Sequence, residues 1–489
     1  MTDAADLTAT EARRLIARRQ LSPVELTEAC IARLEAINPA INAVVATDLA
    51  GMREAAKAAE DAVMKGGALG AVHGLPFGVK DMIDVTGLPT TFGSEIFKDN
   101  IAVKDDAIVA AMRGAGAIVL GKTNNPEFSA GGNTVNTVYG PTGNPHDPSK
   151  SAAGSSGGSA AALAVGMAPL CTGSDTGGSL RNPAAFCGVV GFRPSPGVVP
   201  GDTRGVALIH LPTPGPMART VADTALMLSV LARPDRLDPY TGVLDGHTLW
   251  DPSDFTRLPR RDLSSLKIAF TEDYGFAMTE QVVRRAFRER VAHLAPFFAT
   301  AEETTPDCTD ADRIFSVLRA IMMLSIHHAN TLKYPGRYGP NIMANVEEGL
   351  SYSALDVADA MNRQGVYYRN WQRFFGDYDF ILSPAVTITP RDWHELYPEE
   401  IDGVATKSYY QWLAMAYAST IPGHPSITIP MGRDECGMPF GLQIVGKRND
   451  DLGVLAVAAE IEMLLAGDST FGPPKPDLDA LKAATPIKR

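Results

Sequence analysis

The sequence predicts an α/β fold in which helices cover a β-sheet. From residue 71 onward, short apolar runs bounded by glycine alternate with segments of helical pattern, an alternation typical of α/β proteins. The 489 residues are 45% hydrophobic and 20% charged, which is ordinary for a globular protein and leaves ample apolar surface for a core.

The first 70 residues are expected to be mainly helical. One helix is predicted over residues 9–16. Ser22 and Pro23 then supply the capping serine and first-position proline of a second helix, which extends to about residue 36. Residues 52–65 are rich in Ala, Glu and Lys and predict a third helix.

Residues 71–231 are expected to form the strands and helices of the core. The short apolar runs predict strands at 77–80, 117–122, 165–171 and 189–192. Helical patterns intervene at 106–115 and 159–168, and an amphipathic helix is predicted at 220–231, after the proline-rich stretch 212–216.

The remainder of the chain carries weaker signals. Residues 232–262 are rich in Asp, Pro and Arg and indicate a surface excursion. Strands are predicted at 266–270, 380–384 and 426–430, the last two stopped by proline, and a charged helix is predicted at 280–295. Residues 471–489 are polar and contain proline, so a loose tail is expected.

Charge and composition exclude several classes of function. The formal charge is −12 and no long basic run occurs, so a nucleic acid partner is not expected. The N-terminus is acidic rather than cationic, and no apolar run reaches the ~18 residues of a membrane span, so neither a signal peptide nor a membrane association is expected. The five cysteines are odd in number and lack CxxC spacing, which favours reduced thiols in the cytoplasm over a zinc site.

A glycine-rich loop is a candidate oxyanion site. In the segment from Asp175 to Ser179, consecutive glycines let the backbone N–H groups of Thr176, Gly177, Gly178 and Ser179 converge on one point. Ser179 would then attack the carbonyl whose oxygen these groups hold. An isolated Gly-Gly-Ser is more often a turn with a surface serine, but here two further segments accompany it.

The second segment, residues 153–159, is rich in glycine and serine and contains Ser155 and Ser156. It lacks the lysine of a phosphate-binding loop, but it matches G-x-S-x-G with Ser156 as an alternative nucleophile. That alternative needs an acid and a histidine. No apolar strand leads into Ser156 and no histidine lies in a known motif, although several are available: His210, His247, His293, His327, His328, His394 and His424.

The third segment contains Lys80, which follows an apolar run. Such a lysine is usually a surface residue that extends its charge into water. A catalytic lysine must instead be neutral, and burial can lower a lysine pKa by ~3–5 units from about 10.4. The flanking residues Leu75, Pro76, Phe77 and Val79 are compatible with a buried site.

Together and in this order, the three segments resemble the amidase signature family. The similarity covers roughly the whole chain and is weakest between about 232 and 380. It includes the matching segments 74–76, 121–124, 140–145, 183–191, 215–223, 423–430 and 441–446.

The resemblance implies a fold and a set of catalytic roles. The fold is one large α/β domain with a central mixed sheet and helices on both faces. Ser179 is the implied nucleophile, Ser155 the bridging serine held in a cis peptide after Gly154, and Lys80 the base. The intervals of 75 residues from Lys80 to Ser155 and 24 from Ser155 to Ser179 agree with the family's layout. Ala153 stands where the family often has a glycine.

The resemblance also implies supporting residues and a division of the chain. Asp175 and Arg181 match positions that support the loop, and no metal or organic cofactor is required. Residues 1–70 are expected to be a helical segment packed on the core, and 71–231 the core with the catalytic residues. Residues 232–470 are the variable region and C-terminal part of the same domain, and 471–489 the loose tail.

Substrate expectations rest on one departure from the family. In the glutamine-using transamidase subunits an aspartate follows a tyrosine-containing helix, and the corresponding residue here is Leu413. Together with the aromatic content of this helix, that indicates a small, uncharged aryl or alkyl amide. Phe128, Ser129 and Trp412 are candidate substrate-binding residues, although ordinary core packing is about as good an interpretation of Trp412.

The expected function is therefore hydrolysis of a small carboxylic amide through a serine acyl-enzyme. Alternatives are a carbamate or ester hydrolase of the same family, and the amide-donating subunit of a glutamine-dependent amidotransferase. A binding protein that keeps the fold without chemistry is disfavoured by the intact Lys80, Ser155 and Ser179. The sequence does not determine the oligomeric state and leaves a homodimer open.

Overall fold

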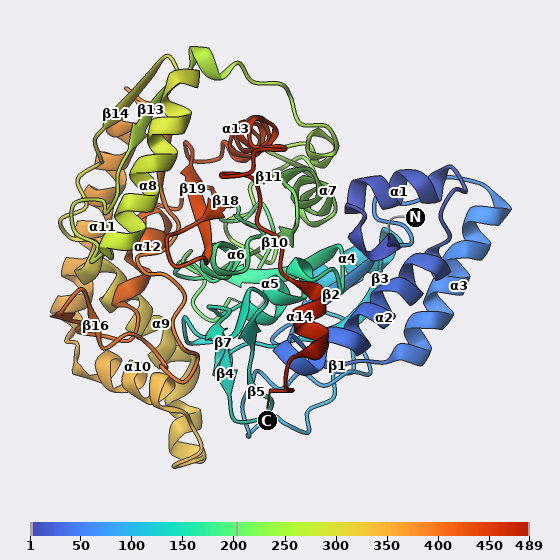
Figure 1. The fold of residues 1–489 in the computed structure, drawn as a ribbon. Helices are drawn as coiled ribbons and strands as arrows, with labels where there is room; N and C mark the ends of the chain where they lie inside the picture. Colours follow the sequence, from blue (N-terminus) through green and yellow to red (C-terminus); the bar gives the residue numbers. More distant parts are fainter. Residues whose placement is uncertain (1–2, 202–203, 488–489) are drawn as a thin grey trace.

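An eleven-stranded sheet runs through the molecule (Figure 1). The computed structural model describes residues 3–201 and 204–487. In spatial order the strands are β1 (Val44–Ala46), β3 (Ile118–Thr123), β2 (Pro76–Lys80), β8 (Leu170–Asp175), β10 (Thr213–Ala218), β9 (Val190–Arg193), β18 (Ser426–Arg433), β19 (Pro439–Val445), β15 (Phe380–Pro384), β13 (Lys267–Phe270) and β14 (Thr300–Glu303).

The sheet is mixed. β2 pairs in parallel with β3 and β8, and β13 pairs in parallel with β14 and β15. The other neighbouring pairs are antiparallel. Short parallel regions therefore stand toward both ends of an antiparallel centre.

Helices cover both faces of the sheet, because successive strand residues point to opposite sides. Leu170 and Ala218 pack in one core with α7 (Val221–Leu231) and α13 (Asp451–Leu464). Their neighbours Cys171 and Met217 pack in another core with α5 (Gly157–Ala164) and with Ala184 of α6 (Arg181–Cys187). The predicted mixed sheet with helices on both faces is confirmed.

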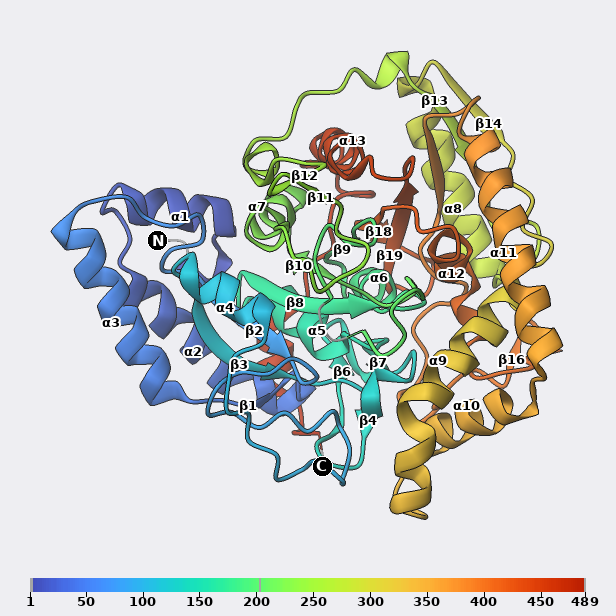
Figure 2. The same ribbon diagram turned by 180° about the vertical axis from the view of Figure 1, so that it is seen from behind.

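The remaining helices lie mainly at the two ends of the sheet. α1 (Ala9–Ala17), α2 (Pro23–Ile41) and α3 (Leu49–Lys65) lie at the end that carries β1 and β3, with α4 (Ala107–Gly114) beside them (Figure 1). α8 (Gln281–Leu294), α9 (Ala311–Lys333), α10 (Pro340–Ser351) and α11 (Ala354–Phe374) lie at the opposite end, as the reverse view also shows (Figure 2). α12 (Ala414–Thr420) packs on α9.

Short elements complete the chain. The strands outside the main sheet are β4 (Val135–Asn136), β5 (Gly140–Pro141), β6 (Gly143–Asn144), β7 (Asp147–Ser151), β11 (Val243–Leu244), β12 (His247–Thr248), β16 (Glu400–Ile401) and β17 (Val404–Ala405). The 3₁₀ turns are η1 (Ala4–Asp6), η2 (Glu127–Ser129), η3 (Pro252–Thr256), η4 (Leu263–Ser265), η5 (Ala295–Phe297) and η6 (Gln411–Leu413).

Most of the predicted helices are present, and their capping residues act as the sequence indicates. Ser22 accepts a hydrogen bond from the N–H of Val24 at the start of α2. Thr220 accepts one from the N–H of Asp223 at the start of α7. The strands predicted around Lys80, residue 120, residue 190 and residue 268 are also confirmed.

Several strand boundaries differ from the prediction. The strand expected at 165–171 begins only at Leu170, because residues 165–169 form the turn that ends α5. The proline-rich stretch before α7 is itself a strand, β10. It tolerates Pro214 and Pro216 because its pairing with β9 involves only Met217 and Ala218. β18 continues past Pro430 to Arg433, with a shift of register between them.

The C-terminal segment is ordered rather than a loose tail. It contains α14 (Leu478–Ala483), which lies against α2. Leu481 is buried in the core that α2 shares, and the N–H of Ile487 donates to the carbonyl of Pro39 at 2.9 Å. One buried leucine in a polar segment is too weak a periodic signal to predict this helix.

Candidate active site

Lys80 is the last residue of β2 and lies inside the protein. Its side chain is fully buried, with Nζ 2.7 Å from Ser155 Oγ and 3.1 Å from Ser174 Oγ. Burial lowers the pKa of Lys80 to about 7, although the negative charge of Asp175 acts in the opposite direction. A large share of this lysine is therefore uncharged at neutral pH and able to accept a proton.

Ser155 reaches Lys80 from the segment that leads into α5. The peptide bond between Gly154 and Ser155 is cis, as the resemblance implies. A Cβ at position 154 would lie 3.0 Å from the carbonyl oxygen of Gly131 and 3.1 Å from the carbonyl carbon of Gly132, so backbone on the facing segment leaves room only for glycine. Ser155 is thus held at a fixed position between Lys80 and the cavity described below.

The loop from β8 to α6 carries Ser179. The N–H groups of Thr176, Gly177 and Ser179 have no hydrogen-bond acceptor among the residues that the structure describes. All three residues line the same cavity as Ser155. The loop therefore presents unpaired donors beside a serine hydroxyl, the arrangement needed to hold an oxyanion.

Gly178 corrects one expectation. Its N–H donates to Asp175 Oδ1 at 2.8 Å, so it is not available to a substrate oxygen. Its φ of +112° is a conformation that favours glycine, and a Cβ there would lie 2.7 Å from Ala416 Cβ. Gly178 therefore shapes the loop, and the three neighbouring N–H groups remain as donors.

Asp175 organises the loop from inside. It accepts hydrogen bonds from the N–H groups of Gly178 and Leu180, and from both Nε and Nη2 of Arg181 at 3.0 Å. Arg193 Nη1 lies 3.3 Å away. Burial alone would raise the pKa of Asp175, but the two guanidinium groups hold it well below its usual range.

Arg181 connects this loop to the C-terminal part of the chain. Its Nη1 donates to the carbonyl of Ala416 at 2.9 Å, to Ser419 Oγ at 2.8 Å and to Gln443 Oε1 at 2.7 Å. Its Nη2 also donates to Thr420 Oγ1 at 2.8 Å. The predicted supporting residues therefore form a fully buried network that joins β8, α12 and β19.

Replacing Asp175 with asparagine should strongly destabilise the fold. The substitution leaves the guanidinium groups of Arg181 and Arg193 buried without a negative charge. We expect the free energy of unfolding to fall by about 3–5 kcal/mol in a urea titration. Glu435→Gln is the control, because it removes a carboxylate that pairs with Arg285 at the surface and should change stability little. Equal stability of Asp175→Asn and the wild type would contradict this account of the loop.

Ser156, the alternative nucleophile, faces away from the cavity. Its side chain is fully buried, and its Oγ lies 3.4 Å from the N of Ser174 and 3.5 Å from its carbonyl oxygen. It also stands directly before α5 without capping it through its side chain. Ser156 therefore packs on the backbone of β8, while Ser155 and Ser179 line the cavity.

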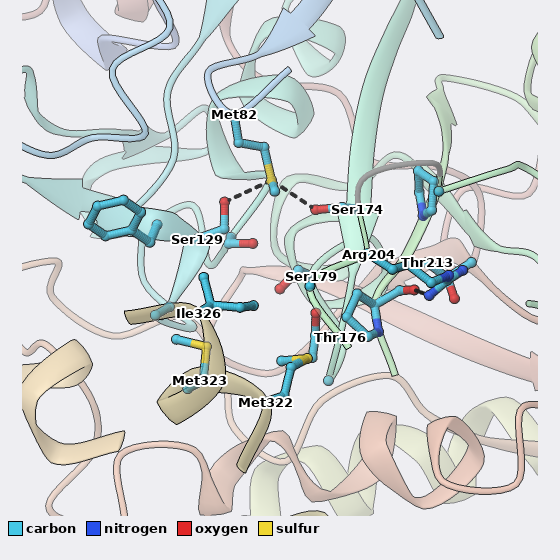
Figure 3. Close-up of a pocket in the computed structure, with 18 of the residues that line it drawn as sticks. Met82, Ser129, Ser174, Thr176, Ser179, Arg204, Thr213, Met322, Met323 and Ile326 are labelled. Carbon is cyan, nitrogen blue, oxygen red and sulfur yellow. Dashed lines mark hydrogen bonds between the residues drawn. The ribbon is translucent and has the colours of Figure 1, made fainter. Parts of the chain in front are cut away.

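The cavity has a volume of about 470 Å³. Figure 3 shows Met82 on one side and Met322, Met323 and Ile326 of α9 on the other, with Ser179 between them. Its walls are largely apolar and come from segments distant in the sequence. A site of this kind takes a small organic molecule and excludes water from it.

Two of the three predicted substrate-binding residues line this cavity. Phe128 and Ser129 both do, and both adopt left-handed backbone angles, with φ of 47° and 56°. The ring of Phe128 stacks with Phe92 and Tyr338, and the hydroxyl of Ser129 donates to Met82 Sδ at 3.1 Å. These contacts fix both side chains in the wall.

Trp412 lies outside the lining of the cavity. It is 3% exposed, its Nε1 donates to the carbonyl of Tyr409, and its ring packs near Phe186. A Cβ at Gly132 would lie 2.2 Å from the Trp412 ring, so the indole rests directly on that glycine. The η6 turn directs its neighbours Tyr409 and Leu413 toward the cavity instead, and Trp412 fits the core-packing interpretation.

Sequence reasoning missed two features of the site. Ser174 contacts Lys80, and the only signal for it was its place beside Asp175 at the end of a strand. The α9 residues that form one wall lie in the weakly matching middle of the chain, where no motif marks them. Among the described residues, no helix has the length and apolar character needed to cross a membrane.

Comparison with known proteins gives consistent matches over nearly the whole chain. A family model described as Amidase matches residues 25–455. An acylamidase of Rhodococcus erythropolis is 34% identical over 93% of this chain and 95% of the relative. One of the subunits of the glutamyl-tRNA(Gln) amidotransferase of Roseiflexus castenholzii is 31% identical over 94% of this chain and 95% of the relative.

A solved structure shows the same architecture. The crystal structure of a bacterial aryl acylamidase of the amidase signature family superposes with a TM-score of 0.87. The two sequences are 28% identical, and the match covers 98% of this chain and 99% of that one.

Proposed function

Because this chain belongs to the amidase signature family, whose members cleave amide C–N bonds, we propose that it hydrolyses small carboxylic amides with uncharged aryl or alkyl groups. One observation carries the proposal. A buried lysine with a pKa of about 7 contacts a serine that lines the same cavity as Ser179 and its three free N–H groups. These are a base, a relay, a nucleophile and an oxyanion site.

The proposed reaction begins with proton transfer. Neutral Lys80 takes the proton of the Ser155 hydroxyl, and Ser155 takes the proton of Ser179 as the Ser179 oxygen attacks the amide carbonyl. The negative charge that develops on the carbonyl oxygen is held by the N–H groups of Thr176, Gly177 and Ser179.

Collapse of the tetrahedral intermediate breaks the C–N bond. The proton returns from Lys80 through Ser155 to the departing amine, and the acyl group stays on Ser179 as an ester. Water, deprotonated by the same relay, then cleaves that ester and regenerates Ser179. No step needs a metal or organic cofactor.

The cavity walls support an uncharged substrate next to the scissile bond. Leu413 lines the cavity at the position where glutamine-using subunits carry an aspartate, so no carboxylate from this position meets a substrate amino group. Met322, Met323 and Phe128 add apolar surface. The acylamidase relatives favour the same class of substrate.

Two alternatives share this chemistry and can be separated by assay. A carbamate or ester hydrolase would use the same nucleophile, and the amide-donating component of a glutamine-dependent amidotransferase is favoured by the 31% identical relative. We expect the purified chain to release aniline from acetanilide without a partner and to leave glutamine uncleaved. Cleavage of glutamine only, or of phenyl acetate and carbamates only, would select the corresponding alternative.

Ser156→Ala should leave substantial activity. The Ser156 hydroxyl makes two long contacts with the Ser174 backbone and does not line the cavity. Loss of such contacts is expected to lower kcat/KM on acetanilide by less than about tenfold, because they correspond to weak hydrogen bonds. An inactive but folded Ser156→Ala enzyme would revive the elbow alternative.

We further propose a cytoplasmic enzyme that acts on small molecules rather than nucleic acids or membranes. All five cysteines are free thiols, four of them buried. The chain carries a formal charge of −12. A homodimer is the assembly that we propose, and light scattering of the purified chain tests it.

A further inference from the structure

Arg319 is a buried cation in the wall of the cavity. It lies on α9, is 6% exposed, and lines the cavity together with Ser155, Thr176, Gly177 and Ser179. The α9 residues on this wall are spaced three or four apart, so they form one face of the helix: Phe315, Arg319, Met322, Met323, Ile326 and His327. In Figure 3 this face stands opposite Met82.

Arg319 lacks the partner that other buried arginines have. Among the described residues, no carboxylate lies within ion-pair distance of Arg319, whereas Arg181 and Arg193 pair with Asp175. Its one hydrogen bond there runs from Nη1 to the Asn345 side-chain oxygen. A guanidinium group has five N–H donors, so most of its donors remain available on the cavity side.

The surroundings hold the guanidinium group in place without neutralising it. Its Cζ lies 4.8 Å from the ring centre of Tyr409 and 4.5 Å from that of Tyr410, where the ring faces stabilise a cation. Asn345 is itself fixed by the hydroxyl of Tyr409. Glu348 acts on Arg319 only at a distance, since its carboxylate accepts a hydrogen bond from Tyr410.

The state of the group and its position suit it to a ligand. Burial lowers the pKa of Arg319 to about 10, so it is still charged at neutral pH. Phe315 lies against the oxyanion loop, because a Cβ at Gly177 would be 2.8 Å from its ring. Arg319 is one helical turn further along the same face, about 6 Å from Phe315 along the axis.

We propose that Arg319 binds an oxygen acceptor on the substrate, a carbonyl or carboxylate oxygen remote from the scissile amide. The inference rests on the proposed function and narrows its substrate class. The preferred amide has an apolar body against the methionine wall and a second oxygen about one helical turn from the carbonyl that is attacked. Arg319 is a specificity-determining residue, since it contacts the substrate away from the reacting atoms.

Matched probe amides test the proposal. In the acyl series, the anilides of pentanoic acid, 4-oxopentanoic acid and succinic acid carry an alkyl, a carbonyl and a carboxylate end. In the amine series, acetanilides carry ethyl, acetyl or carboxyl groups at the para position. For at least one series, we expect kcat/KM of an acceptor-bearing probe to exceed that of its alkyl isostere by about tenfold or more, as a buried bond to a charged donor would give.

The same ratio should collapse toward one in Arg319→Met, whatever the absolute loss of rate. Arg319→Gln should behave alike, and it serves if the methionine variant does not fold. Arg313→Met is the matched control, because Arg313 lies on the same helix, pairs with Asp356 and does not line the cavity. It should retain the wild-type ratio. Which oxygen is preferred follows from comparing the ketone and carboxylate probes.

Binding to Ser179→Ala protein repeats the test without turnover. Calorimetric titration should show tighter binding of acceptor-bearing probes than of alkyl isosteres, and Arg319→Met in that background should abolish the difference. If no probe is turned over but this difference is present, the proposed chemistry fails and the role of Arg319 stands. An equal preference in the Arg319 variants and the wild type, or no preference in the wild type in either measurement, would overturn the inference.

Discussion

Replacing Ser179 with alanine is expected to abolish hydrolysis, with kcat/KM on acetanilide reduced by about 10⁴-fold or more, because nucleophile removal eliminates the covalent route. The fold should survive. Ser179 is half-buried, and its hydroxyl makes no hydrogen bond to another side chain among the described residues. Aniline release under saturating and limiting substrate measures the loss.

Thermal denaturation of the Ser179→Ala protein is the necessary control. A melting temperature within a few degrees of the wild type would assign the loss to chemistry. Ser156→Ala provides the matched hydroxyl deletion 23 residues away in the sequence. Residual activity of folded Ser179→Ala close to that of the wild type would contradict the proposed nucleophile.

Replacing Lys80 with alanine is expected to inactivate the enzyme as well. Nζ is 2.7 Å from Ser155 Oγ, so the substitution leaves the relay without its proton acceptor. General-base catalysis contributes about 10²–10⁴-fold, and kcat should fall by at least this factor. Single-turnover kinetics on the folded variant should show that acylation, rather than release of product, is slowed.

The pH dependence of the wild type tests the same residue independently. Because Lys80 must be uncharged to accept a proton and its pKa is about 7, kcat/KM should rise with pH through about 7 and level off above it. A lysine with its usual pKa would place that rise more than three pH units higher. Wild-type turnover in Lys80→Ala, or a rate independent of pH between 6 and 8, would remove Lys80 from the mechanism.

Local features of the fold could be predicted because they depend on neighbouring residues. Ser22 with Pro23 and Thr220 with Asp223 are helix starts that a short stretch of sequence specifies. The short apolar run before Lys80 likewise indicates a buried strand, and the structure has one there. The identity of the three candidate catalytic positions came from the resemblance, since a lysine and two serines have no chemical meaning at these spacings alone.

Other features depend on long-range contacts and left no local signal. The cavity is completed by α9, more than 130 residues after Ser179, and the Asp175 network includes Gln443, which lies 262 residues after Arg181. Gly178 was expected to donate to an oxyanion because it belongs to the glycine run. Its N–H is instead taken by Asp175, three residues earlier, and only the folded geometry of the loop reveals this.

The central claim is that Ser179 is the activated nucleophile, and labelling with a serine-directed fluorophosphonate tests it most directly. The reagent needs no knowledge of the substrate, and peptide mass spectrometry locates the adduct. We expect one adduct on Ser179, lost in Ser179→Ala and strongly slowed in Lys80→Ala. An adduct on Ser156, or equal labelling of Lys80→Ala and the wild type, would contradict the account.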